Sequence, residues 1–252
     1  MNKQYIFLYK KYFIIFFIIF IVFSGCVSTN KIVYNNSINK IYNTAKKKMY
    51  HNDFKVAIND FEFLNNRYPL NPYYNQIQLN LIYCYYKTFE LQMAIDVIDR
   101  FIHLNQTHPN IDYVIYMRAL IAMDLDDEVL YDIFNIKKNY ERDTKNAYLA
   151  FKYFNQLIYS FPESLYTNDA IKRLFYLKNR LANFDLSVIK FYNKLGVYIA
   201  VINRSQQMLQ DYPSTKATIE ALKYMKIAYE KIGLIEESKK VSDIILNNSK
   251  NF

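Results

Sequence analysis

A chain of 252 residues, of which 52% are hydrophobic and 22% charged, can bury a sizeable core, which excludes a wholly disordered protein. Only three glycines, five prolines and no tryptophan are present, a scarcity typical of an all-helical protein. The formal net charge is +9, but Lys and Arg are spread along the chain. The single tight basic run, 46–48, fits a solvated helix face, so nucleic-acid binding is not indicated.

The first segment, 1–25, is predicted to be a signal peptide. Lys10 and Lys11 precede an apolar run, 13–23, which is short for a membrane-spanning helix and suits a signal-peptide core. Removal of the segment also takes away Lys3 and lowers the formal net charge from +9 to +6. An uncleaved anchor helix is the alternative interpretation of the same run.

The residues that end this segment predict lipidation. Ser-Gly-Cys at 24–26 resembles a lipobox, in which Cys26 becomes the acylated first residue of the mature chain, although Phe23 stands where Leu is usual. Val27 follows the cysteine, and bacterial lipoproteins without Asp at that place usually go on to the outer membrane. We therefore expect a protein held on the periplasmic side of the outer membrane by acyl chains.

Cys84 is the second cysteine. With Cys26 acylated it has no partner for a disulfide, so a free thiol is expected. Because it lies between Tyr83 and Tyr85 in a strongly apolar segment, we interpret it as a small core residue.

A repeated pattern of residues follows the N-terminal segment. The complete pattern has a turn residue five places before a small or apolar anchor, an apolar residue three places before it and Pro twelve places after it, and the last copy, which ends near Asn248, lacks this Pro. In the second copy Gln106 stands where Pro is expected, and Pro109 lies just beyond. The anchors are Ala57, Ala94, Ala150, Val201 and Ser238; the pattern Asn52, Phe54, Ala57, Pro69 recurs as Lys145, Ala147, Ala150, Pro162 and as Gly196, Tyr198, Val201, Pro213, while Gly233 and Ile235 precede the last anchor.

These offsets are those of the tetratricopeptide repeat, a pair of antiparallel helices of about 34 residues. A small residue lets two helices approach closely, Gly or Asn ends the first helix, and Pro ends the second. About five such pairs stack into a superhelix in which each buries its apolar face against its neighbours. The predicted fold is therefore an all-α superhelical array of about five tetratricopeptide repeats.

The spacing of the anchors shows where the array is interrupted. The intervals are 37, 56, 51 and 37 residues. The excess in the second interval falls on 124–143, which we interpret as a long loop with a turn of helix at 128–134. The excess of 14 residues in the third falls on 167–195, a stretch without a helix breaker, which predicts one unusually long helix.

The expected organisation follows from these interruptions. A lipidated tether occupies 26–39. An N-terminal half of three units spans 40–165, and a C-terminal half of two units, which begins with the long helix, spans 166–248.

No group of residues predicts catalysis, a metal or a cofactor. His51, His103 and His108 lack the spacing of metal ligands, and His108 before a turn Pro suits a capping or surface role. Glu163 and Ser164 would suit a lytic transglycosylase, but they follow a repeat Pro, where both are ordinary residues for a helix start. No lysozyme-like domain is expected after them.

Aromatic and polar residues near the second helix pair predict a peptide-binding surface. Most tyrosines of a helical array pack between repeats, and that interpretation applies to any one of Tyr73, Tyr74, Tyr83, Tyr85 and Tyr86. Tyrosines beside two prolines at a unit junction also suit binding of partly apolar extended peptides, and polar neighbours can bond the peptide backbone. The predicted set is Asn66, Arg67, Tyr68, Tyr73, Tyr74, Gln76 and Asn80.

Four short segments carry a family resemblance: Asn-Arg-Tyr-Pro at 66–69, then 83–87, 98–102 and 107–113. The sequences of these segments resemble the BamD family. Its members are the lipoprotein subunit of the outer-membrane β-barrel assembly machinery, and the resemblance runs from the signal peptide to about Asn248. It implies a non-enzymatic scaffold whose C-terminal half docks the periplasmic domains of the barrel subunit and whose N-terminal units receive unfolded outer-membrane proteins. Other assembly lipoproteins are further expected partners.

Arg204 is the predicted partner-binding residue. The residue alone fits a solvated Arg equally well, but the matching Arg of the family lies in the half that docks the barrel subunit. Two rival functions stay open: a different repeat lipoprotein, such as a pilus-assembly pilotin, and a cell-wall lytic enzyme.

Overall fold

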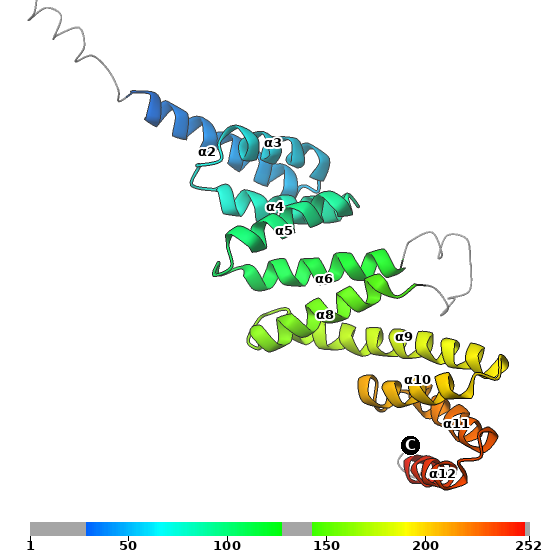
Figure 1. The fold of residues 1–252 in the computed structure, drawn as a ribbon. Coiled ribbons are helices and arrows are strands. Elements are labelled where there is room, and N and C mark those ends of the chain that lie inside the picture. The colour runs from blue at the N-terminus through cyan, green and yellow to red at the C-terminus, as the bar shows by residue number, and fades with distance from the viewer. Residues whose placement is uncertain (1–28, 128–142, 250–252) are drawn as a thin grey trace, which may run out of the picture. The chain divides into compact units, whose positions relative to one another are not determined.

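Helices make up all the regular structure that the computed structural model describes, which covers residues 29–127 and 143–249. Ten helices lie within these ranges (Figure 1), which confirms the predicted all-α class. They are α2 (Thr29–Tyr50), α3 (Phe54–Arg67), α4 (Tyr74–Lys87), α5 (Leu91–Leu104), α6 (Ile111–Asp127), α8 (Lys145–Ser160), α9 (Thr167–Lys194), α10 (Tyr198–Asp211), α11 (Lys216–Lys231) and α12 (Ile235–Ser249).

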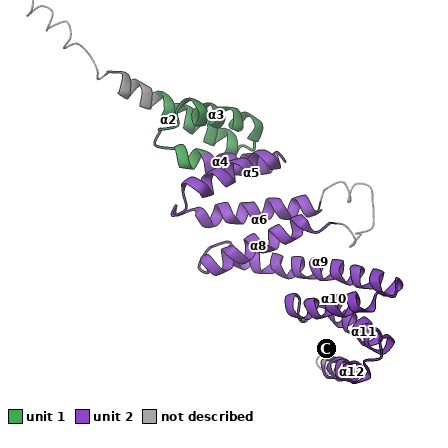
Figure 2. Cartoon of the chain, in the orientation of Figure 1, with its two compact units in different colours: residues 1–77 green, residues 78–252 purple. Residues whose placement is uncertain are grey.

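The chain divides into two compact units, residues 1–77 and 78–252, and the division falls inside α4 (Figure 2). In unit 1, α2 packs against α3. In unit 2, α5 packs on α6, α6 on α8, α8 on α9, and α9 on both α10 and α11, while α12 packs on α11. From α5 onward, the described helices that follow one another along the chain are thus neighbours, as in a repeat array.

The five anchors of the repeat lie on the second helix of successive pairs, α3, α5, α8, α10 and α12. All five are buried, which confirms the predicted register of the helix pairs and fits a close approach between the packed helices. Their exposed fractions are 0% at Ala57, Ala94, Ala150 and Val201 and 4% at Ser238.

Turns inside four of the pairs contain a residue in the left-handed region, always five places before the anchor. These residues are Asn52, Phe89, Gly196 and Gly233, with φ of 65°, 62°, 71° and 82°. Gly and Asn adopt this conformation at low cost, whereas Phe89 does not. The prediction of a turn at Lys145 is wrong, because Lys145 is the first residue of α8.

In three of the pairs the second helix, α3, α8 or α10, ends at an aromatic residue followed by Pro. Tyr68, Phe161 and Tyr212 each donate their backbone N–H to the carbonyl four residues earlier, at 2.8 to 3.0 Å. Pro disfavours helical backbone at the residue before it and cannot donate to the preceding turn, so the helix stops there.

Helix α9 is 28 residues long, whereas α3, α4, α5 and α10 have 14 residues each. The breaker-free stretch is therefore a single helix that exceeds an ordinary repeat helix by 14 residues, the excess seen in the spacing. Its second part packs with α10, α11 and α12 around an apolar cluster that includes Leu186, Ile189, Val201 and Met225.

Two predicted boundaries differ from the structure. Helix α2 begins at Thr29, inside the predicted tether 26–39, and α6 continues to Asp127, so the first residues of the predicted loop 124–143 are helical. The signal peptide, Cys26 and residues 128–142, with the expected helical turn at 128–134, lie outside the described residues.

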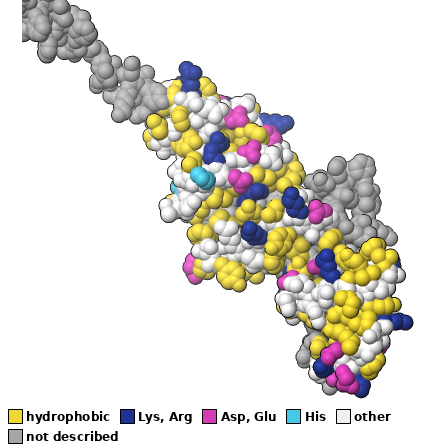
Figure 3. Space-filling view, viewed as in Figure 1, with side chains coloured by type: hydrophobic (Ala, Val, Ile, Leu, Met, Phe, Trp, Pro, Cys, Tyr) yellow, Lys and Arg dark blue, Asp and Glu magenta, His cyan; other side chains and the backbone are white. Residues whose placement is uncertain are grey.

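On the face drawn in Figure 3, hydrophobic side chains form contiguous areas, and basic and acidic side chains are interspersed among them. The mixture of charges agrees with the spread of Lys and Arg along the sequence. Among the described helices, none combines the length and the hydropathy needed to cross a membrane.

Candidate protein-binding site

The first predicted binding segment lies in unit 1, around the turn that follows α3. Asn71 organises this turn: its side-chain amide donates to the Tyr68 carbonyl at 2.6 Å, and its side-chain oxygen accepts from the backbone N–H of Tyr73 at 2.7 Å. Pro69 and Pro72 have no backbone N–H to donate, and the Asn71 side chain adds to the backbone hydrogen bonds of the turn, in which the Asn71 N–H donates to Tyr68 and the Tyr74 N–H to Asn71, both at 3.1 Å. Asn71 is absent from the predicted set, although Asn between two prolines signals a turn.

The polar members of the predicted set in unit 1 are accessible. Asn66 and Arg67 are exposed at the end of α3, and Gln76 is exposed on α4. Leu70, at the tip of the turn, is 97% exposed. The turn thus presents an apolar side chain together with polar groups, as a surface that binds a partly apolar peptide would.

The tyrosines of the set are half-buried and partly engaged in packing. Tyr73 stacks on Tyr42 of α2, with ring centroids 4.3 Å apart and 7° between the ring planes. Tyr68 lies edge-on to Phe63 at 5.9 Å, and Tyr74 is half-buried. Packing therefore accounts for one ring face of Tyr73, which leaves less of that residue for a peptide than the sequence indicates.

Asn80 belongs to unit 2 and is buried, with 7% of its surface exposed. Its side chain is not accessible to a peptide in this structure, which corrects its place in the predicted set. The later tyrosines of α4 differ among themselves: Tyr85 is buried, Tyr86 is half-buried and Tyr83 is 38% exposed.

Arg204, the predicted partner-binding residue, lies on α10 in unit 2 and its side chain is 48% exposed. Its Nη1 donates to Oδ1 of Asp185 on α9 at 3.3 Å, and the Asp185 side chain is 19% exposed. Burial raises the pKa of Asp185, the charge of Arg204 opposes the rise, and Asp211 adds to it. The carboxylate is thus held in place at some electrostatic cost.

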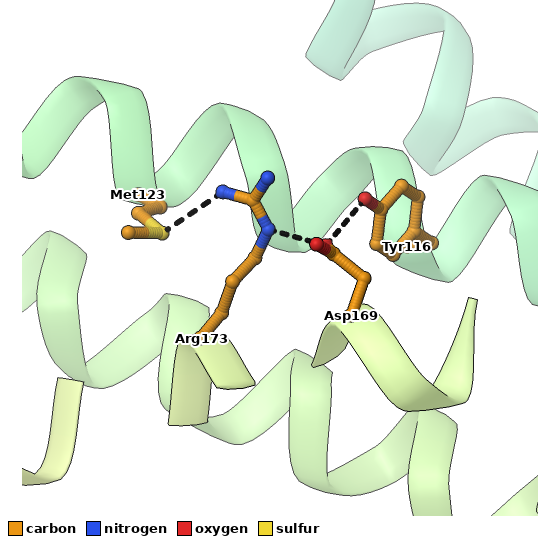
Figure 4. A network of polar contacts seen from close by, with 4 residues as sticks. All are labelled: Tyr116, Met123, Asp169 and Arg173. Atoms are coloured by element: carbon orange, nitrogen blue, oxygen red, sulfur yellow. Dashed lines mark hydrogen bonds and ion pairs between the residues drawn. The ribbon is translucent and has the colours of Figure 1, made fainter. Parts of the chain in front are cut away.

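A polar network joins α6 to α9, and its residues are absent from the predicted set (Figure 4). Tyr116 Oη donates to Asp169 Oδ2 at 2.7 Å, Arg173 Nε donates to the same oxygen, and Arg173 Nη1 lies 3.6 Å from Met123 Sδ. Burial alone would raise the pKa of Asp169, but the hydrogen bonds from Arg173 and Tyr116 lower it below its ordinary value. Asp169 and Arg173 lie four apart, a spacing that predicts their pairing within one helix but not the contact with α6.

Aromatic rings extend this network. Tyr116 stacks on Tyr166 with centroids 4.6 Å apart, and Tyr113 lies 5.9 Å from Tyr166. Close by in sequence, Ser164 Oγ donates to Asp112 Oδ2 at 2.7 Å. Burial, followed by the hydrogen bond to Asp169, raises the pKa of Tyr116 to about 12.

A buried ion pair lies further along the same two helices. Arg180 Nε of α9 is 3.3 Å from Asp126 Oδ2 of α6, and their side chains are only 10% and 3% exposed. A pair that is removed from water to this extent fixes how α6 and α9 align, because either charge alone would be costly to bury.

The residues considered for catalysis or metal binding lie in turns or at exposed positions of the array. Glu163 is exposed in the turn between α8 and α9. His108 Nδ1 accepts from the backbone N–H of Asn110 at 3.1 Å in the turn before α6, while His51 and His103 are exposed. No three His, Cys, Asp or Glu side chains gather as metal ligands within the described ranges.

Cys84 is a buried free thiol, as predicted. Burial raises its pKa to about 12, so it stays protonated at physiological pH.

Comparisons with known proteins agree with the resemblance in the sequence. The sequence model of the family described as "YfiO: Outer membrane lipoprotein" matches residues 34–244. A relative from Vibrio cholerae, named outer membrane protein assembly factor BamD, is 37% identical over 89% of this chain and 92% of its own length. Relatives with the same name from Buchnera aphidicola and Pasteurella multocida are each 38% identical, over 95% and 83% of this chain and 98% and 80% of their own lengths.

Proposed function

Because the chain belongs to the YfiO family of outer membrane lipoproteins, we propose that it is an assembly factor for outer-membrane proteins. In this proposal acylated Cys26 anchors the protein on the periplasmic side of the outer membrane, and the helical array serves as a scaffold without catalytic activity. The match over nearly the full length of relatives named outer membrane protein assembly factor is the observation that carries it.

The proposed partner of unit 2 is the periplasmic part of the barrel subunit of the assembly machinery, bound through Arg204. Among the described residues, the half-exposed guanidinium of Arg204 donates one hydrogen bond, to Asp185, and its other N–H groups can serve a partner carboxylate. Other assembly lipoproteins are further candidate partners of the scaffold.

The test is a pull-down from solubilised outer membranes with the native lipoprotein as bait and mass spectrometry as readout. Near-equal recovery of the barrel subunit is expected, and recovery of pilus or cell-wall proteins in its place would contradict the assignment. Arg204→Gln should weaken recovery, whereas Arg100→Gln, at an exposed Arg of α5, should not. Gln is preferable to Glu, because Glu would place a second carboxylate beside Asp185.

The second proposed activity is reception of unfolded outer-membrane proteins by the turn after α3 in unit 1. Asn66, Arg67 and Gln76 would bond the peptide backbone, and Tyr68, Tyr73, Tyr74 and the fully exposed Leu70 would contact its apolar side chains. This combination suits the aromatic-ended strand signal that the family resemblance implies.

Site-specific photo-crosslinking tests this activity. A photoreactive residue at Leu70 should capture a peptide that ends in an aromatic residue, whereas the same residue at Leu165 should not. Leu165 is the matched control, because it is 93% exposed in the corresponding turn after α8. Equal capture at both positions would mean that the peptide binds exposed leucines without selection.

Absence of catalysis is tested with a zymogram of the purified protein on cell-wall material. Clearing of the gel that disappears in Glu163→Gln would favour the lytic enzyme instead, since Glu163 is the one residue with a sequence context that suggested it.

A further inference from the structure

Helix α2, the first described helix of unit 1, has a packed side and an exposed side. Its residues Ile38, Tyr42 and Ala45 are buried, and α2 packs against α3. A residue two positions away along a helix points to the opposite side, about 200° around the axis. Lys40 and Lys47 have this relation to Ile38 and Ala45, and both lysines are exposed. The middle of the exposed side of α2 is therefore basic.

The positive charge of α2 is not balanced within the helix, whose sequence has five Lys and no Asp or Glu. Lys48 Nζ pairs with Asp60 Oδ2 of α3 at 2.6 Å, which offsets one of these charges. The last helix of unit 2, α12, differs, because Lys239 and Lys240 each pair with a Glu of the same helix, at 3.7 and 3.1 Å. Helix α12 thus has the mixed charge of an ordinary solvated face, whereas α2 does not.

An aromatic residue lies beside the lysines at the end of α2. Tyr50 is the last residue of the helix, and 69% of its surface is exposed. The ammonium of Lys46 is 5.7 Å from the ring centroid of Tyr50 and also 5.7 Å from that of the buried Tyr42, within the range of cation–π attraction. A tyrosine combines an apolar ring with a polar hydroxyl, a combination that suits the boundary between lipid headgroups and acyl chains.

The basic face of α2 consists of Lys40, Asn43, Lys46, Lys47 and Tyr50. We propose that this face lies along the membrane surface and binds the phosphates of anionic lipid headgroups. The lysines pair with the phosphates, and Tyr50 enters the headgroup region. The inference rests on the proposed acylation of Cys26, and it adds to the acyl chains a second, electrostatic contact with the same membrane.

The length of α2 determines how the helix must lie for this contact to form. At 1.5 Å per residue, Lys40 is roughly 17 Å and Lys47 roughly 27 Å from the helix start at Thr29. Attraction to a charged membrane falls off within a Debye length, about 8 Å at physiological ionic strength. A helix that stood upright on the membrane would leave both lysines outside this distance. The proposal therefore requires α2 to lie along the surface.

The proposed anchor favours headgroups over an acidic protein as the ligand of the basic face. Cys26 is three positions before Thr29, the first residue of α2. Once Cys26 is acylated, lipid headgroups surround the start of the helix, and binding of the basic face becomes an intramolecular step with a high effective concentration of ligand. An acidic protein would have to compete with that concentration from solution.

The experiment measures the distance of α2 from lipid headgroups by fluorescence quenching. The acylated full-length protein with Asn43→Cys carries a fluorophore at position 43, and the vesicles carry a quencher on their headgroups. Quenching should be strong in vesicles of phosphatidylethanolamine with phosphatidylglycerol, weak in vesicles of phosphatidylethanolamine with phosphatidylcholine, and reversed by high salt. Asn59→Cys, at an exposed residue of α3, is the matched control and should be quenched weakly in both. Cys84 is buried, so the unmodified protein should take up no fluorophore.

Charge substitutions in the labelled protein test the lysines directly. Lys40→Gln together with Lys47→Gln should lower quenching at position 43 to the level of the α3 control, whereas Arg at both positions should retain it. Lys239→Gln together with Lys240→Gln removes the same charge from α12 and should change nothing. Circular dichroism should show the same helix content in all of these variants, since the four lysines are exposed.

The possible failures separate this inference from the anchor on which it rests. A protein that does not float with either kind of vesicle would refute the acylated anchor. A protein that floats but shows equal quenching at position 43 in both lipid mixtures, or quenching that survives the Gln substitutions, would overturn the basic face as a lipid-binding surface. Weak quenching in vesicles, combined with lysine-dependent shielding of the fluorophore in native outer membranes, would also overturn it and would assign the face to an acidic protein.

Discussion

The two parts of α9 make contacts of different chemistry. Its first part, 167–180, faces α6 through Asp169, Arg173 and Arg180, which pair with tyrosine and carboxylate groups. Its second part, 181–194, packs mainly through apolar residues into the cluster that it shares with α10, α11 and α12, and its ion pairs, Asp185 with Arg204 and Lys190 with Glu220, are partly exposed. The first part of α9 thus belongs to a polar junction with α6, and the second part belongs to an apolar core.

The difference indicates two ways of holding neighbouring repeats. Buried apolar surface supplies most of the stabilisation but tolerates sliding, because it is not directional. Ion pairs and hydrogen bonds add less net stability and penalise every misaligned arrangement. We therefore expect the polar junction to set alignment between α6 and α9, and the apolar core to stabilise the C-terminal helices.

Breaking the buried ion pair should have the largest effect. Arg180→Ala leaves Asp126, which is 3% exposed, without its guanidinium, and the free energy of unfolding should fall by about 3–5 kcal/mol. Urea unfolding followed by circular dichroism measures it. The double variant Asp126→Leu with Arg180→Met should regain most of the loss, and a single variant as stable as the unmodified protein would contradict the importance of the pair.

A cavity in the second part of α9 should have the next largest effect on the free energy of unfolding. Ile189 is fully buried, so Ile189→Ala should cost about 2–5 kcal/mol in the free energy of unfolding. Lys194→Ala, at an exposed residue of the same part, should stay within about 0.5 kcal/mol. Similar losses in both variants would mean that the apolar core does not dominate this part of the helix.

A substitution in the turn that follows α9 should have a smaller effect on stability. Gly196 has φ of 71° and nothing but Tyr198 Oη at 4.0 Å near the site of an added Cβ, so the cost of Gly196→Ala is conformational and not steric. It should destabilise the protein by about 1–2 kcal/mol in a thermal or urea transition. Gly196→Asn should cost less, because Asn tolerates this conformation, as Asn52 does in the corresponding turn. Equal losses for Ala and Asn would point away from the backbone explanation.

Much of the fold could be predicted because its signals are local. The left-handed turn residue, the small anchor and the Pro after the second helix each act within a few residues, so the pairs and the length of α9 follow from spacing. The start of α2 could not be predicted in this way. Its buried residues Ile38, Tyr42 and Ala45 have helical spacing, but they lie towards its C-terminal end and give no signal for a start at Thr29.

The candidate site was less predictable, because its members depend on distant partners. The exposure of Arg67 follows from its place at a helix end, whereas the stacking of Tyr73 needs Tyr42, 31 positions earlier in the sequence, to arrive from α2. The contact of Arg204 with Asp185 likewise depends on how α9 and α10 cross. Sequence spacing indicates which residues share one helix face, but not which residue faces them from another helix.

Two aspartates sharpen the contrast between the parts of α9, because their pKa values shift in opposite directions. The pKa of Asp169 is lowered in the folded state, so its contribution to stability is present above the ordinary pKa of the side chain and is lost as pH falls through the folded value. The pKa of Asp185 is raised, mainly by burial, so the stability present below the ordinary pKa of the side chain is lost as pH rises through the folded value.

Substitution by Asn should therefore have opposite signs at the two positions. At pH 7, Asp169→Asn should lower the free energy of unfolding and Asp185→Asn should raise it, each by less than about 1 kcal/mol because both groups are partly exposed. Both differences should disappear when unfolding is measured at a pH below the two folded pKa values, where the unmodified carboxyls are neutral as well. Loss of stability in both variants at pH 7 would mean that the ion pair with Arg204 outweighs the burial of Asp185, and the second part of α9 would then depend on polar contacts as the first does.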